Sequence, residues 1–111
     1  MSKFSQGRRR GNSTAPADEV GPTIAVSCVN NVPRISFSGG TVGIRTIFRL
    51  YYDFGLGWQQ GEWAPIAQGY VDSELFGCVG EDNIMWRGRY ESGGADPGPW
   101  SNEEPDLVYE I

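Results

Sequence analysis

Glycine and proline interrupt this sequence so often that they limit its fold more than any other feature. The 111 residues include 16 glycines and 7 prolines, which are poor helix formers and favour turns. The stretches between these turn clusters are short, and none keeps the three- and four-residue apolar spacing of an amphipathic helix. We therefore expect one all-β domain.

Several of these stretches alternate apolar and polar side chains with the period of two that a half-buried strand requires. Phe48 and Leu50, for example, alternate with Arg49 and Tyr51. The run GLGWQQGEW is expected to be a glycine-rich connection, and Pro65 indicates an edge strand after it. The expected strands span residues 23–29, 32–38, 44–54, 64–72, 73–80, 83–91 and 106–111. Their number and spacing predict a seven-stranded antiparallel β-sandwich.

Three stretches carry a resemblance to the fibronectin type III domain, a member of the immunoglobulin-like sandwiches. RISFSG resembles its second strand, TIFRLYYD its third, and WRGRYESGGADPGPWSN its sixth strand and the loop into its last. The resemblance covers residues 22–111. Phe37 stands where that family usually has a tryptophan, Trp86 where it has a tyrosine, and Gly88 replaces an inward apolar residue. A sandwich of another lineage or a small barrel is the alternative.

The loop ESGGADPGPWSN is the most specific part of the resemblance. We expect its glycines, Gly93, Gly94 and Gly98, to supply positive φ angles. Trp100 is interpreted as a structural residue that packs where the last strand begins.

Charge divides the chain into a basic arm and an acidic body. The first 14 residues carry +4, whereas the remaining 97 hold 5 basic and 14 acidic residues and carry −9. Residues 1–21 have few large apolar side chains and are expected to form an extended arm, with the folded domain beginning at 22. An acidic body argues against nucleic acid as a partner. The sequence shows neither a signal peptide nor an apolar run long enough to cross a membrane.

The residue types needed for most catalytic and metal sites are missing. The sequence has no histidine, which removes the commonest general base and metal ligand. The two cysteines lack zinc-ligand spacing, and we interpret Cys28 and Cys78 as buried free thiols, with a disulfide as the alternative. Acidic runs near the end of the chain lack the spacing of an EF-hand. We therefore expect no enzyme activity, no cofactor and no metal.

Two sets of residues remain as candidate binding sites. The arm residues that carry positive charge or a large apolar group are Lys3, Phe4, Arg8, Arg9 and Arg10. The aromatics around the glycine-rich run are Trp58, Trp63 and Tyr70, and exposed aromatics of this kind suit stacking on sugars or on another protein. Arg87 and Arg89 are expected to lie on a solvated strand face and to pair with neighbouring acids.

A stand-alone fibronectin-like domain with a basic arm resembles small virion proteins of tailed bacteriophages, such as head decoration (cement) or tail accessory proteins. The resemblance implies a structural protein that is assembled in the host cytoplasm and located in the virion. The arm would anchor it to the major capsid protein or another virion protein, for example by adding a strand to a neighbour's sheet. The alternative is a carbohydrate- or cell-surface-binding module that uses the aromatics on host glycans. The sequence leaves the oligomeric state open.

Overall fold

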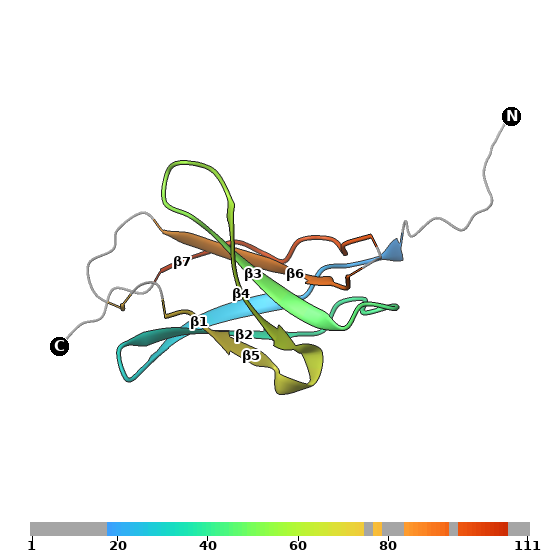
Figure 1. The fold of residues 1–111 in the computed structure, drawn as a ribbon, viewed down its shortest axis with the longest axis horizontal. Helices are drawn as coiled ribbons and strands as arrows, with labels where there is room; N and C mark the ends of the chain where they lie inside the picture. Colours follow the sequence, from blue (N-terminus) through green and yellow to red (C-terminus); the bar gives the residue numbers. More distant parts are fainter. Residues whose placement is uncertain (1–17, 75–76, 79–83, 94–95, 107–111) are drawn as a thin grey trace, which may run out of the picture.

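The computed structural model describes residues 18–74, 77–78, 84–93 and 96–106, and it is a sandwich of two antiparallel sheets (Figure 1). Sheet A has three strands in the order β1 (Thr23–Val29), β2 (Val32–Ser38) and β5 (Tyr70–Asp72). Sheet B has four in the order β4 (Gln59–Pro65), β3 (Ile47–Asp53), β6 (Met85–Glu91) and β7 (Glu104–Pro105). A short 3-10 helix, η3 (Ile66–Gln68), follows β4. The predicted fold class is confirmed.

The core lies where the inward side chains of the two sheets meet. Phe37 of β2 stacks on Phe48 of β3 with ring centroids 4.2 Å apart. Leu50 and Trp86 are fully buried beside them. The alternation predicted for β3 and β6 is confirmed, because every second residue of these strands faces this core. The buried apolar residues are Ile24, Ile35, Phe37, Phe48, Leu50, Ala64, Val71, Ile84, Trp86 and Tyr90.

Gly88 lies on this inward face of β6, and its missing side chain has a physical reason. A Cβ atom at Gly88 would lie 2.1 Å from Cζ of Phe48, which is far inside van der Waals contact. The Phe48 ring therefore fills the space that an apolar residue at this position would occupy. Glycine here is a packing requirement of the aromatic core.

Four of the predicted segments are wrong in detail. The expected connection 55–63 contains most of β4. The expected strand 64–72 is not one strand, because Ala64 and Pro65 end β4, η3 covers Ile66–Gln68 and β5 begins at Tyr70; Pro65 nevertheless ends a strand at the edge of sheet B. In the expected strand 73–80, Ser73, Glu74, Gly77 and Cys78 are not in a strand, and its other residues lie outside the described chain. The last strand, β7, precedes the predicted range 106–111, of which only Asp106 is described. Glycines obscured the strand in the first case, because their lack of side chains breaks the period-two pattern.

The two cysteines form a disulfide, so the interpretation as free thiols is wrong. Cys28 lies on β1, at one edge of sheet A, and Cys78 follows β5, at the other edge. The bond therefore closes a covalent link between segments 50 residues apart. Spacing alone did not reveal the pair, because only the packing of the two segments brings the sulfur atoms together.

The N-terminal arm meets the sandwich at one end, and the β3–β4 loop lies at the other (Figure 1). The Thr41 N–H donates to the Val20 carbonyl at 2.8 Å, and the Val20 N–H donates to the Thr41 hydroxyl at 3.1 Å. Glu19 pairs with Arg45 at 2.9 Å. Arg45 also donates to the carbonyls of the β6–β7 loop, which fixes where the arm leaves the domain.

Candidate functional site

The outward face of sheet B gathers most of the positive charge of the folded domain. We call it the arginine face and define it by Arg49 and Tyr51 on β3 and Arg87, Arg89 and Glu91 on β6. These residues alternate with core residues along their strands and pair across them, Arg49 opposite Arg89 and Tyr51 opposite Arg87. Three of the five arginines that follow Arg10 therefore lie on one side of an otherwise acidic body.

Trp100 covers the middle of the arginine face. The Arg87 guanidinium lies 3.7 Å from the centroid of the Trp100 ring and that of Arg89 lies 4.1 Å from it. The Trp100 ring also meets Tyr51 edge-on at 4.8 Å. Tyr51 is consequently only 9% exposed although its side chain points away from the core. Stacked guanidinium and aromatic groups attract one another through the ring quadrupole, so Trp100 fastens the β6–β7 loop to the sheet.

Two neighbours of Trp100 fasten the same loop by other contacts. The Ser101 hydroxyl accepts a hydrogen bond from the Gly88 N–H at 3.0 Å. The side-chain amide of Asn102 both accepts from and donates to the backbone of Ile24 on β1. This pairing links the edge of sheet A to the end of the loop. The sequence pattern singled out Trp100 alone, and nothing in the spacing revealed the roles of Ser101 and Asn102.

Glu91 is the anionic centre of the arginine face. Arg89 donates to its carboxylate at 2.8 Å and Arg49 at 3.4 Å, and the Tyr51 hydroxyl donates to the same group. Burial alone would raise the pKa of the Glu91 carboxyl, but these hydrogen bonds and the charge of Arg89 outweigh it and hold the pKa below its ordinary value. Burial lowers the pKa of Arg87, whereas for Arg89 the bonds to Glu91 and Tyr51 outweigh burial and raise it.

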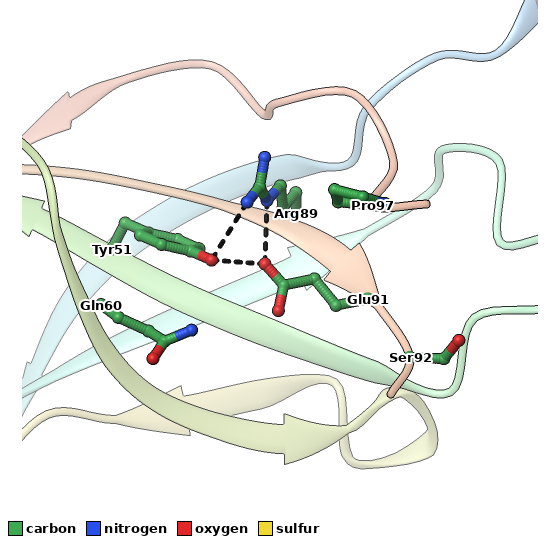
Figure 2. A pocket seen from close by; sticks show the side chains of 6 residues that line it. All are labelled: Tyr51, Gln60, Arg89, Glu91, Ser92 and Pro97. Atoms are coloured by element: carbon green, nitrogen blue, oxygen red, sulfur yellow. Dashed lines mark hydrogen bonds and ion pairs between the residues drawn. The ribbon is translucent and has the colours of Figure 1, made fainter. Parts of the chain in front are cut away.

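A small open pocket of about 180 Å³ lies at the Glu91 end of the arginine face (Figure 2). It is lined by Tyr51, Gln60, Arg89, Glu91, Ser92 and Pro97. Figure 2 shows the Tyr51 hydroxyl, the Arg89 guanidinium and the Glu91 carboxylate turned toward one another. Gln60 comes from β4, opposite Tyr51, so the pocket spans three strands and the loop after β6.

Trp63 lies on the same outward face of sheet B as this pocket, although it is not one of the residues that line it. It lies on β4 directly opposite Arg49, and Arg49 in turn contacts Glu91 in the pocket wall. The Trp63 side chain is 54% exposed. An exposed ring next to a polar recess is an arrangement that can stack on a flat ligand and hydrogen-bond its edge.

The three predicted aromatics do not form one platform. Trp58 is half-buried and lies against Arg87, with the guanidinium 4.1 Å from its ring centroid. Tyr70 is on β5 of sheet A, where Arg34 lies over its ring at 4.1 Å. Only Trp63 offers an exposed face beside the pocket. The arm residues Lys3, Phe4, Arg8, Arg9 and Arg10 lie outside the described residues.

The prediction of a solvated arginine strand holds only in part. Arg87 pairs with Glu103 of the β6–β7 loop, and Arg89 pairs with Glu91 of its own strand rather than with an acid on a neighbouring strand. The side chains of Arg87 and Arg89 are only 18% and 24% exposed, because aromatic rings cover them. The glycine prediction for the following loop is wrong for Gly93 and Gly98, which are not among the residues with positive φ, and Gly94 lies outside the described residues.

The chain matches no protein-family model, no curated protein and no solved structure. Within the described ranges, no three potential metal ligands among Cys, Asp and Glu gather in one place. The described part of the chain also contains no helix of the length and hydrophobicity that crossing a membrane requires. The class that the coordinates define is a two-sheet antiparallel β-sandwich with an arginine-rich outer face.

Proposed function

We propose that the protein is a non-enzymatic binding protein whose sandwich supports a saccharide-binding surface on sheet B. The observation that carries this proposal is that exposed Trp63 lies opposite Arg49 on the same outward face of sheet B as the polar pocket. Stacking of a sugar ring on an aromatic face supplies apolar contact. The Gln60 amide and the Ser92 hydroxyl offer both donors and acceptors to sugar hydroxyls.

A glycan array tests the binding function directly. The wild-type protein is expected to bind a subset of the glycans, and Trp63→Ala to lose that binding while keeping the fold. Tyr70→Ala is the matched control, because Tyr70 lies on the other sheet. Equal binding by wild type and Trp63→Ala would contradict a role for this surface.

We further propose that the domain is a virion accessory protein, of the head decoration or tail type, which the basic arm anchors to a capsid or other virion protein. The arm and the β3–β4 loop lie at opposite ends of the sandwich, which would let an anchored domain project that loop away from the virion surface. The arm enters beside Glu19, which Arg45 holds, whereas Leu56, 77% exposed, lies in the loop at the far end. The disulfide also suits a protein that works outside a reducing cytoplasm.

Deleting residues 1–17 tests the anchor without removing the contacts of Glu19 and Val20. The shortened domain is expected to have the same free energy of unfolding as the full chain but to lose binding to undecorated phage capsids. A variant with Arg8, Arg9 and Arg10 changed to Gln separates charge from length. Undiminished capsid binding by the deletion would exclude the anchoring role.

The strand order supports a fibronectin-type lineage as the finer assignment of the fold. In the constant-type immunoglobulin sandwich the fourth strand belongs to the sheet of the first two. Here β4 pairs with β3 in sheet B. We therefore propose the fibronectin type III arrangement over the constant-type immunoglobulin arrangement.

A further inference from the structure

We propose that the surface formed by Trp63, Arg49 and the neighbouring pocket selects acidic saccharides, with Arg49 binding a sugar carboxylate. This inference rests on the proposed saccharide-binding function and names its ligand class. Arg49 lies directly opposite the exposed ring of Trp63 on the neighbouring strand. The hydrogen bonds that Arg49 makes therefore decide whether it can bind a ligand stacked on that ring.

The guanidinium of Arg49 makes one hydrogen bond within the described residues, fewer than those of Arg34, Arg45 and Arg89, whereas Arg87 makes none and is covered by aromatic rings instead. Arg49 donates through Nε alone, to Glu91 at a long 3.4 Å. Arg34 holds Asp72 through two nitrogens, and Arg45 uses all three of its nitrogens. Arg87 lies over two tryptophan rings. Within the described residues, neither Nη group of Arg49 makes a hydrogen bond, although its side chain is only 24% exposed, as much as that of Arg89. The proposal therefore places the ligand at these two Nη groups.

A guanidinium with two unengaged nitrogens suits a carboxylate, because its planar fork matches two carboxylate oxygens. The charge around the site favours the same ligand. Arg49 and Arg89 share the single carboxylate of Glu91, so this group of three side chains carries one net positive charge, although Arg49 itself does not line the pocket. On a domain of net negative charge, this group of arginines is the region that favours an anionic ligand.

The pocket supplies partners for the remaining groups of a sugar. Gln60 is exposed, and neither its amide nor the Ser92 hydroxyl has a side-chain hydrogen bond among the described residues. The cavity of about 180 Å³ is small and open, so it suits one sugar ring with its neighbours extending over the surface. Tyr51, Arg89 and Glu91 hold one another, so the wall is in place before the ligand arrives.

Trigalacturonate and its trimethyl ester are the probes, because they share the sugar rings and differ at the three carboxylates, which the ester neutralises with methyl groups. Isothermal titration calorimetry of the full chain is expected to show that the acid binds at least about tenfold more tightly than the ester, as charge-assisted hydrogen bonds imply. Arg49→Gln is expected to bind both probes equally, at the affinity of the ester. Trp63→Ala is expected to bind neither.

Matched variants on the opposite face provide the control. Arg34→Gln and Tyr70→Ala alter an arginine over an aromatic ring on sheet A and are expected to leave both affinities unchanged. Proton–nitrogen correlation spectra of each variant report whether the fold is intact. A triglutamate peptide tests the carboxylate without the sugar ring and is expected to bind more weakly than trigalacturonate.

The outcomes separate this inference from the function on which it depends. Equal binding of acid and ester by the wild type would overturn the selection for acidic sugars and leave saccharide binding standing. Binding of triglutamate as tight as that of trigalacturonate would replace the saccharide by an acidic peptide. Binding of no glycan on the array and of neither trisaccharide would overturn both proposals.

Discussion

The outer faces of the two sheets use the same groups in different ways. On sheet A, Arg34 holds Asp72 through two hydrogen bonds and lies over Tyr70, and these contacts join only β2 and β5. On sheet B, the arginine face joins β3, β6 and the β6–β7 loop through Trp100.

The difference shows that one aromatic ring laid over a strand face can join separate ion pairs into one connected set of contacts. Isolated ion pairs at a surface contribute little because water screens them and their side chains lose freedom. Trp100 covers Arg87 and Arg89 on sheet B, which excludes water from them and connects separate pairs into one assembly. Sheet A has a covalent link instead, the Cys28–Cys78 disulfide between its two edges.

The largest expected effect comes from removing that link. Changing both cysteines to serine is expected to lower the free energy of unfolding by about 4 kcal/mol in the chain-entropy account of a loop of this length. Urea unfolding of the oxidised protein, the reduced protein and the double variant measures it. Coincident unfolding curves for all three would show that sheet A does not depend on the disulfide.

Trp100→Ala tests the assembly on sheet B. Loss of two cation–π contacts and of the apolar area under the ring is expected to lower the free energy of unfolding by about 2–3 kcal/mol. Tyr70→Ala, which removes the ring under Arg34 on sheet A, is the matched comparison and is expected to cost less. Equal losses would mean that the two faces contribute alike.

The pH dependence of stability isolates Glu91. Its pKa is lower in the folded protein than its ordinary value of 4.5, so the unfolded chain binds a proton more readily. The contribution of Glu91 is therefore present above about pH 4.5 and is lost as the pH falls through its folded pKa. Glu91→Gln is expected to unfold with a flatter dependence below that pH. Parallel wild-type and variant curves would contradict this.

The smallest change in the free energy of unfolding is expected from breaking the ion pair on sheet A. Arg34→Gln removes the ion pair with Asp72, which is about one-third exposed and therefore well screened by water and salt. Its urea midpoint should stay close to that of the wild type, and 0.5 M salt should not change the difference. A loss as large as that of Trp100→Ala would remove the contrast between the faces.

The period-two pattern of apolar residues predicted the core well, because that pattern reflects which side chains are buried. Phe37, Phe48, Leu50 and Trp86 are buried on the faces that the alternation assigned to them. It failed for β4, where Gly61 leaves a position without a side chain to count.

The candidate site could be predicted less completely, because it depends on contacts between distant segments. The aromatic composition of 58–63 did point to Trp63. The pairing of Trp63 with Arg49 and the cover that Trp100 provides depend on the sheet register, which no local pattern specifies.

The indole N–H signals of the four tryptophans provide the most direct test of the ligand surface on sheet B. Titration with trigalacturonate is expected to shift the signal of Trp63, which is exposed beside Arg49, and to leave that of core Trp86 in place. The trimethyl ester should shift Trp63 only at higher concentration. No shift of Trp63 with either trisaccharide, while other backbone signals move, would place the ligand elsewhere and contradict the account.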